Sequence, residues 1–254
     1  MNREKEINQK GFTLAEVLIT LGIIGVIAAL TLPVLIQKNR ETELTSRAKK
    51  SYSTISQAVK MVEAKNETPG DISALFDGGG NPNAYELTKN FAKYFNGAKV
   101  CQNAAERGCA NYYYKVSYAI PRTDGNGTLT EWDQRYIAKI ILPDETVIGI
   151  QQYPSCDWLQ TSYKTDSFGN ILKDDAGNNI TVSYQSSICA DIIFDTNGSK
   201  NPNKFGADVF AIQVLKNKIR PTAHKPFGAD SFNSLITNGK LIFTNYKSGE
   251  RLDF

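Results

Sequence analysis

The stretch of sequence that decides the fold is GFTLAE at residues 11–16, which opens an apolar segment that continues to Ile36. The twenty residues from 17 to 36 contain no charged side chain. Because an α-helix rises about 1.5 Å per residue, a segment of this length extends roughly 30 Å, the thickness of the hydrocarbon core of a bilayer. We therefore predict a membrane-spanning helix over residues 12–36.

Glu16 places a carboxylate at the start of this apolar segment. An ionisable side chain inside a membrane span is costly and by default indicates a function. Two simpler interpretations of the segment are open. A cleaved secretory signal has a shorter apolar core, of about 7–15 residues, followed by a cleavage site with small residues. A plain signal anchor fits the length of the segment but gives no reason for Glu16 or for the residues that precede it.

A third interpretation accounts for all of these residues. GFTLAE followed by a long apolar run resembles the class III signal of type IV prepilins and type II secretion pseudopilins. The resemblance implies that a prepilin peptidase cuts between Gly11 and Phe12 and that the new amine of Phe12 is methylated. It also implies that Glu16 pairs with the N-terminal amine of a neighbouring subunit, which offsets the desolvation of both charges. Pro33 falls where many pilins have a helix-loosening proline.

The same resemblance implies partners and a location. The partners are homologous pilin or pseudopilin subunits, the prepilin peptidase and an inner-membrane assembly platform. The chain would cross the bacterial inner membrane once, with its head outside the cytoplasm, and then enter a periplasmic or surface filament. The distribution of charge points the other way, because more basic residues follow the span than precede it, which favours a cytoplasmic C-terminal side. We follow the motif, since the peptidase acts on a cytoplasmic leader.

The apolar pattern continues beyond the membrane segment as one face of an amphipathic helix. The residues on this face are Leu44, Ala48, Tyr52, Ile55, Val59 and Val62. The helix should reach about residue 64, because Thr68-Pro69-Gly70 then ends it. We therefore expect one helix of about 50 residues, made of the membrane segment and a second half that packs on the head.

Strand patterns follow the helical part of the chain, so we predict an α+β, pilin-like fold with an antiparallel sheet. A short second helix is expected from Asn83 to about residue 96, after a glycine-rich linker at 78–82. Strands are expected at 112–120, 136–142, 146–151, 188–194, 209–215 and 240–245. The predicted organisation is a leader at 1–11, a transmembrane and assembly helix at 12–36, and a globular head at 37–254.

The cysteines agree with a head outside the cytoplasm. The chain has four cysteines, Cys101, Cys109, Cys156 and Cys189, and their spacing fits no zinc motif. An even number of cysteines in an exported domain favours disulfides, and four cysteines allow three pairings. We favour Cys101–Cys109 with Cys156–Cys189, while four free buried thiols are the alternative.

A loop rich in oxygen-bearing side chains lies between two predicted strands. Asp195, Asn197 and Asp208 fall in a pattern of aspartate, asparagine and turn glycines that resembles a loop of pseudopilin-like heads. Such oxygens suit calcium, which takes six to eight oxygen ligands, and the resemblance implies a calcium site here. The EF-hand spacing is absent, and an Asx-rich turn between strands is the simpler interpretation. We expect no cofactor other than this weak candidate.

The sequence offers no catalytic constellation. His224 is the one histidine, and no Gly-x-Ser-x-Gly motif is present. The formal charge of +3 carries no strong signal for nucleic-acid binding. We therefore predict a non-enzymatic structural subunit of a type IV pilus or a type II secretion pseudopilus, and the expected mature length of 243 residues favours a minor subunit. The alternatives are an adhesin or receptor head that binds through residues 153–185 and, less well supported, a membrane-anchored enzyme.

Overall fold

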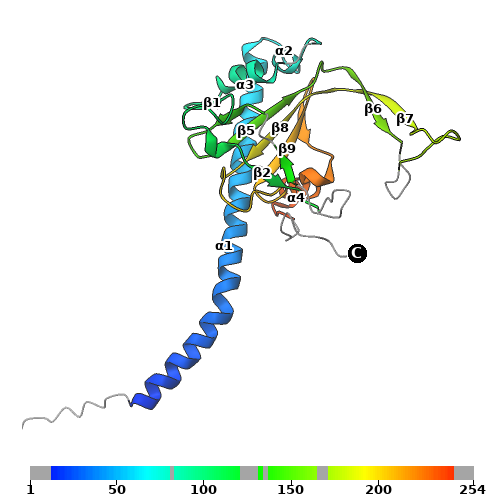
Figure 1. Cartoon of the computed structure of the whole chain (residues 1–254). Helices are drawn as coiled ribbons and strands as arrows, with labels where there is room; N and C mark the ends of the chain where they lie inside the picture. Colours follow the sequence, from blue (N-terminus) through cyan, green and yellow to red (C-terminus); the bar gives the residue numbers. More distant parts are fainter. Residues whose placement is uncertain (1–12, 81–82, 121–130, 134–136, 165–170, 243–254) are drawn as a thin grey trace, which may run out of the picture. The chain divides into compact units, whose positions relative to one another are not determined.

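The computed structural model describes residues 13–80, 83–120, 131–133, 137–164 and 171–242 (Figure 1). The chain divides into two compact units, Met1–Glu43 and Leu44–Phe254. The predicted cleavage site, with Gly11 and Phe12, lies outside the described residues.

Helix α1 (Leu14–Lys65) is 52 residues long, which confirms the long N-terminal helix. It contains an 18-residue window of mean hydropathy 2.5, and among the described helices it is the one long and apolar enough to cross a membrane. It ends at Lys65, shortly before Pro69 and Gly70, as the turn residues predict. Its buried residues all lie in the second unit and occupy one face, which is the amphipathic stripe of the sequence. They are Leu44, Ala48, Ser51, Ile55, Ala58, Val59 and Val62.

The second unit is built on a six-stranded sheet in the order β1-β4-β5-β8-β9-β10, in which every neighbouring pair is antiparallel. The strands are β1 (Lys99–Cys101), β4 (Lys139–Ile141), β5 (Val147–Gln152), β8 (Ile188–Asp195), β9 (Val209–Leu215) and β10 (Ile219–Pro221). Strands β8 and β9, which pair with each other, are buried along nearly their whole length because both faces of the sheet are covered there. This arrangement confirms the α+β fold with an antiparallel sheet.

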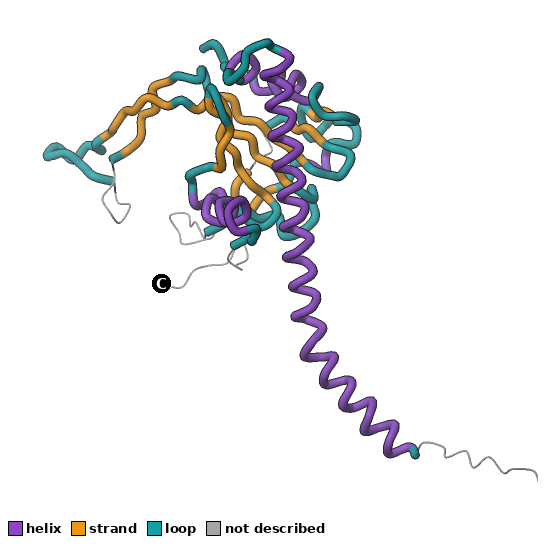
Figure 2. The backbone as a smooth tube through the Cα atoms, turned by 180° about the vertical axis from the view of Figure 1, so that it is seen from behind, coloured by secondary structure: helices purple, strands orange, loops and turns teal. Residues whose placement is uncertain are grey.

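One face of the sheet packs on the second half of α1 and forms the main core (Figure 2). Ile55, Val59 and Val62 of the helix share this core with side chains such as Ile148 and Ile192 of the sheet. Two further helices close the same core, α3 (Ala84–Ala92) through Phe91 and α4 (Ala229–Asn238) through Phe232. Helix α2 (Ser73–Phe76) adds Phe76.

Shorter elements cover the opposite face of the sheet. They are strands β2 (Lys115–Ser117) and β3 (Glu131–Asp133), which pair with each other, and the 3-10 turns η1 (Ala110–Tyr112) and η2 (Lys225–Phe227). Their side chains include Val116 and Trp132, which pack with Ile193, Phe205 and Val209 from the sheet and its loops. As a result, polar side chains on this face of the sheet are shut away from water.

A separate two-stranded sheet, β6 (Trp158–Tyr163) with β7 (Thr181–Ser186), extends away from the six-stranded sheet (Figures 1 and 2). We call β6, β7 and the described residues between them the arm. All of the arm except Ser186 falls within the segment 153–185, for which the sequence predicted a binding surface and no strands. Exposed apolar side chains lie along it, at Leu159, Tyr163, Ile171, Val182 and Tyr184.

Several expected elements are confirmed and others are wrong. The hairpin of 136–142 with 146–151 is β4 with β5, and the strands at 188–194 and 209–215 are β8 and β9. Asn83 caps α3 by accepting the backbone N–H of Glu86 at 3.1 Å, as its position predicts. The strand expected at 240–245 is wrong for residues 240–242, which follow α4 without forming a strand.

Candidate functional site

Thr13 and Glu16 form a capping box at the first turn of α1. The backbone N–H of Thr13 donates to Oε2 of Glu16 at 2.8 Å, and the Thr13 hydroxyl donates to the same oxygen at 2.7 Å. The Glu16 N–H in turn approaches Oγ1 of Thr13 at 3.2 Å. The reciprocal bonds satisfy backbone groups that the first turn of a helix leaves without partners. This capping role of Glu16 was not among the predictions from the sequence, although Thr-x-x-Glu is the usual signal of a capping box.

The capping box leaves part of the Glu16 carboxylate available. Both bonds from Thr13 reach Oε2, and no described residue donates to Oε1. A carboxylate has about four lone-pair sites, so Glu16 can hold the helix start and still accept another donor. Removal of residues 1–11 would leave Thr13 inside the chain, and the box would therefore survive maturation.

The remaining surface of the apolar segment is not covered by any other described part of the chain. A Cβ atom added at Gly22 or Gly25 would meet nothing within 4 Å, so contacts inside the described chain do not explain either glycine. Small residues at such positions let the backbones of two helices approach closely. Pro33 lies within the helix, where it lacks the N–H that would bond the carbonyl of residue 29. The helix continues through this point.

The apolar helix begins directly after the sequence GF and carries a glutamate in its first turn. Both features are part of a known N-terminal sequence motif. Residues 7–32 match the prokaryotic N-terminal methylation motif. This match confirms the resemblance, and the chain carries a prepilin-type signal at its N-terminus. No curated protein and no solved structure matches the chain with significant similarity.

The prepilin-type signal covers the segment that holds Gly11, Phe12 and Glu16, and it ends just before Pro33. It indicates a precursor of the type IV pilin or pseudopilin kind, processed by a prepilin peptidase and assembled with other pilin subunits. The apolar helix fits a membrane-anchored protein of that kind. The motif is also that of a structural protein rather than of an enzyme.

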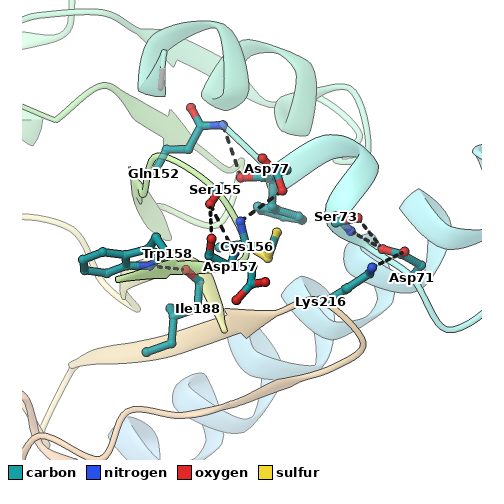
Figure 3. The surroundings of a disulfide bond; sticks show 12 residues. Asp71, Ser73, Asp77, Gln152, Ser155, Cys156, Asp157, Trp158, Ile188 and Lys216 are labelled. Atoms are coloured by element: carbon teal, nitrogen blue, oxygen red, sulfur yellow. Dashed lines mark hydrogen bonds and ion pairs between the residues drawn. A yellow bond between two sulfur atoms is a disulfide. The ribbon is translucent and has the colours of Figure 1, made fainter. Parts of the chain in front are cut away.

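Two disulfides cross-link the head, and they are the two pairs favoured from the sequence. Cys101 joins Cys109, and Cys156 joins Cys189 across 33 residues. The described residues include no free cysteine. The second disulfide ties Cys156, two residues before the arm, to β8, so that the arm starts from a fixed point (Figure 3). A cross-link that closes a loop of this length stabilises the fold by about 3–4 kcal/mol.

Hydrogen bonds reinforce this base of the arm. The Cys156 N–H donates to Oδ2 of Asp77 at 3.0 Å, and the Gln152 amide donates to the Phe76 carbonyl at 3.2 Å (Figure 3). The Trp158 indole N–H donates to the Ile188 carbonyl at 3.0 Å, and its ring stacks on Tyr153 with centroids 4.9 Å apart. The base is therefore held on both sides, by the α2 segment and by β8.

The glycine-rich stretch belongs to this base rather than to a linker, which corrects the interpretation of residues 78–80. The Gly80 N–H donates to the Pro154 carbonyl at 2.7 Å. A Cβ atom at Gly78 would lie 2.5 Å from the carbonyl oxygen of Tyr153 and 2.7 Å from that of Pro154. Only glycine lets the two backbones approach this closely. Residues 81–82 lie outside the described part of the loop.

The structure brings the predicted calcium residues together in a buried loop. Asp195 and Asp208 are fully buried, and Asn197 is nearly so. Asp195 accepts the Tyr114 hydroxyl at 2.8 Å and the Asn197 N–H at 2.9 Å, while Asp208 accepts the N–H groups of Asn203 and Lys204. These bonds are those of an Asx-rich turn, as the simpler interpretation predicts.

The same loop also holds charge that is costly to bury. Burial raises the pKa of Asp208 to about 6. Burial, and then the charge of Asp208, raise the pKa of Asp195 well above its usual range. Within this loop, three buried side-chain oxygens have no hydrogen-bond partner among the described residues, at Thr196, Asn197 and Asn203. These carboxylate, hydroxyl and amide oxygens suit calcium chemistry, and the same loop also buries Lys204. Among the described residues, the one group of three acidic or cysteine side chains close enough to share a metal is Cys101, Glu106 and Cys109, and its two cysteines are joined as a disulfide.

Lys139 is a buried basic side chain whose charge interacts with Asp195 of this loop. It pairs with Gly149 across β4 and β5, and its Nζ lies 3.1 Å from the place that a Cβ atom of Gly149 would occupy. The missing side chain at Gly149 therefore makes room for Lys139 to cross β5. Burial lowers the pKa of Lys139 to about 7, and the charges of Asp195 and Asp133 oppose that shift. His224, in contrast, lies exposed in the loop before η2.

Proposed function

We propose that the chain is the precursor of a structural subunit of a type IV pilus or a type II secretion pseudopilus. Cleavage between Gly11 and Phe12 releases the leader, and methylation follows on the amine of Phe12. Residues 12–36 anchor the mature chain in the inner membrane, with the head of residues 37–254 outside the cytoplasm. An assembly platform then moves it into a filament. The match of residues 7–32 to the methylation motif carries this proposal.

Glu16 and the amine of Phe12 act as the two halves of a docking contact between subunits. A carboxylate and an amine that pair in the membrane offset the desolvation that each would suffer alone. The free Oε1 of Glu16 supports this role, because an incoming amine can bind there without opening the capping box. The amine exists only after cleavage, so assembly waits for maturation.

The rest of the apolar segment contributes packing and local freedom. Large apolar side chains from Leu14 to Ile36 are exposed in the single chain, as expected for a helix that lipid or neighbouring helices surround. Pro33 loosens the helix at the point where its missing N–H frees a carbonyl, and neighbouring helices can satisfy that carbonyl in a membrane or filament.

Intact-mass measurement on the protein from membranes tests the maturation step. The expected mass is that of residues 12–254 plus one methyl group, and an uncut chain would contradict the proposal. The assembly step is tested with Glu16→Val. We expect this variant to be cut and inserted as the wild type is, yet absent from sheared filaments labelled with antibody. Glu16→Gln is the matched control for shape, and it should fail in the same way because it lacks the charge.

The expected mature length favours a minor subunit, and that role also remains a prediction. Quantitative mass spectrometry of sheared filaments measures it as the ratio of this chain to the most abundant pilin. Genes for a retraction ATPase beside this one would favour a pilus, and genes for a secretin would favour a secretion pseudopilus.

A further inference from the structure

The two strands of the arm leave both of their outer edges open. Strands β6 and β7 pair with each other over six residues, and neither pairs with another described strand. The arm extends away from the six-stranded sheet, so that sheet does not cover the outer edge of β7 (Figures 1 and 2). An isolated two-stranded ribbon is marginally stable in water, and independent stability needs three or more strands. The arm therefore gains stability from a further strand at one of its edges.

Strand β7 is the more open of the two. Its first five residues are all exposed, whereas half-buried and exposed residues alternate along β6. The Lys164 N–H donates to the Ile180 carbonyl at 2.8 Å, so the backbone groups of Ile180 point toward β6, and those of every second residue after it do the same. The N–H and C=O groups of Thr181, Ser183 and Gln185 therefore point the other way, to the free edge of β7.

This edge lacks the usual protection of an open strand. Natural proteins prevent unwanted pairing at an edge with proline and with charged side chains, lysine above all. Neither β6 nor β7 contains a proline or a charged residue. At the tip of the arm, Lys164 and Lys173 balance the charges of Asp174 and Asp175. Charge therefore does not oppose the approach of a second copy of the arm.

The side chains along β7 form a row that is complementary to itself. Ile180, Val182 and Tyr184 lie on one face of the ribbon, because alternate residues of a strand share a face, and we call them the apolar row. Val182 is 41% exposed and Tyr184 is 49% exposed. If two β7 strands pair antiparallel about a two-fold axis at Val182, each Ile180 lies opposite the Tyr184 of the other copy. The two Val182 side chains then lie opposite each other, so every member of the apolar row gains an apolar neighbour of the kind that stabilises sheets.

We propose that β7 of one copy of this chain pairs with β7 of a second copy about this two-fold axis. The outward N–H and C=O groups of Thr181 bond to those of Ser183 in the other copy. The two arms form a four-stranded sheet in the order β6-β7-β7-β6. The pairing uses the apolar row of β7 alone, and the exposed Leu159 and Tyr163 of β6 lie on the other face of the ribbon.

Such a contact joins two copies and no more. It is isologous, so it closes after two copies and cannot be the repeating contact of a helical filament. It therefore goes beyond the proposed assembly role, and it joins two chains in the membrane or in two filaments that lie side by side. The Cys156–Cys189 disulfide fixes the base of each arm, so less conformational freedom is lost when the edge binds.

Cysteine cross-linking of the full chain tests this contact. On the proposed axis the two Val182 residues form a non-hydrogen-bonded pair, whose Cα atoms lie about 4.5 Å apart, within the range of a disulfide. We expect Val182→Cys to form a disulfide-linked dimer on a non-reducing gel, in membranes or in sheared filaments. Ser162→Cys is the matched control, because Ser162 pairs with Val182 but lies on β6. Its two copies would be three strand spacings apart, about 14 Å, and should give at least five-fold less dimer.

Charges at the free edge provide a second, independent measurement. In the proposed register Thr181 lies opposite Ser183 of the other copy. Added to Val182→Cys, the changes Thr181→Lys and Ser183→Lys place like charges opposite each other and should lower the amount of dimer at least five-fold. Thr181→Lys with Ser183→Glu changes the same positions but places opposite charges there, and it should keep the dimer. Both side chains are exposed, so both chains should keep the fold, which their melting temperatures check.

Three results overturn the inference. They are no dimer from Val182→Cys, as much dimer from Ser162→Cys, and equal amounts of dimer from the two chains with added charges. A loss of surface attachment in the doubly basic chain, with no dimer from Val182→Cys, would also overturn it and assign the arm to adhesion. The proposed function fails by a different result, a chain that is never cut at Gly11 or never enters filaments, whatever the cross-link shows.

Discussion

Thr13 and Glu16 bond to each other in both directions at the start of α1, so that the carboxylate expected to dock a neighbouring subunit also begins the helix. The cap uses Oε2, and the proposed contact with a neighbouring subunit would use Oε1. Thr13 fixes the rotamer in which Oε1 is presented. A side chain that must meet a partner inside a membrane benefits from such preorganisation, because less conformational entropy is lost on binding.

Replacing Thr13 by valine should therefore weaken assembly without affecting insertion. The variant keeps the shape of threonine and loses the hydroxyl, and a lost N-cap costs about 1 kcal/mol. We expect about a five-fold lower fraction of the chain in sheared filaments, by quantitative immunoblot, and an unchanged fraction in membranes.

Thr13→Ser is the matched control, since it restores the hydroxyl and should restore assembly. If the valine variant assembles as well as the wild type, the capping box does not position Glu16.

Among the glycines at the base of the arm, Gly78 should lose the most stability when it is replaced by alanine. Its backbone conformation is open to other residues, so an alanine would by itself stabilise the fold slightly through the unfolded state. The added Cβ, however, would press on the carbonyl oxygens of Tyr153 and Pro154. We predict that Gly78→Ala lowers the free energy of unfolding of the head by about 1–3 kcal/mol.

Thermal unfolding of the full chain in detergent measures this change, as a melting temperature lower by several degrees. In Gly79→Ala the added Cβ meets nothing within 4 Å, although the φ of +55° disfavours alanine. That variant should cost about 1 kcal/mol and no more. A Gly78→Ala protein as stable as the wild type would show that the two loops can separate without loss.

Much of the fold can be predicted from the sequence because its main elements have strong local signals. The apolar run and the amphipathic stripe after it define α1 to within a residue at its end, and Asn83 marks the start of α3. Strands β8 and β9 are apolar runs of the length that a strand buried on both faces requires. The observed bounds of β8 and β9 agree with the predicted strands at 188–194 and 209–215 to within one residue.

The remaining elements depend on contacts that a single sequence does not reveal. Helix α4 is rich in serine, asparagine and threonine, which are weak helix formers, and it exists because Phe232 and Leu235 enter the core. The arm alternates polar and apolar residues with little burial, so its pattern is close to that of a loop. The role of the Gly78 loop follows from two carbonyl groups that lie more than seventy residues away.

The same difference holds for the candidate site: some of its residues have a local signal in the sequence, and others depend on distant contacts. Glu16 was singled out by the conflict between its charge and the apolar run, a local signal. Its partner within the chain, Thr13, also has a local signal, Thr-x-x-Glu, but the apolar run and the charge of Glu16 point first to a partner in another subunit. Lys139 gave no signal at all, since a lysine in a short strand usually faces water, and only the absence of a side chain at Gly149 explains its burial.

The buried amine of Lys139 should make the stability of the head depend on pH. Burial lowers its pKa in the folded state to about 7, below the unfolded value near 10.5. Between these pH values the unfolded chain binds one more proton than the folded chain, so the free energy of unfolding rises with pH, by about 1.4 kcal/mol per pH unit. Below pH 7 both states hold the proton and this contribution is constant.

Denaturant unfolding of the full chain at pH 7, 8 and 9 measures the slope. In Lys139→Met the rise of the unfolding free energy with pH should be smaller by about 1.4 kcal/mol per pH unit, the contribution of one proton, because no group at this position titrates. Lys60→Met removes an exposed lysine of α1 and should leave the slope as it is in the wild type. Equal slopes in all three proteins would mean that Lys139 keeps its ordinary pKa in the fold.

Calcium should stabilise the head through the loop of residues 195–208. Two buried carboxylates disfavour each other's charge, and a cation between them would remove that cost and bind the unpaired oxygens of Thr196, Asn197 and Asn203. A ligand at a hundred times its dissociation constant stabilises a fold by about 2.7 kcal/mol. We therefore expect a melting temperature several degrees higher with millimolar calcium than with EGTA.

Asp208→Asn separates this effect from the hydrogen bonds of the turn. An asparagine oxygen can still accept the N–H groups of Asn203 and Lys204, but the site loses a charge that calcium needs. The variant should melt at the same temperature with calcium and with EGTA, and magnesium should not replace calcium in the wild type, because magnesium demands a tighter octahedral shell. If EGTA does not change the melting temperature of the wild-type head, the calcium prediction is wrong. Asp195 and Asp208 then serve only a structural turn, held by backbone N–H groups and by the hydroxyl of Tyr114.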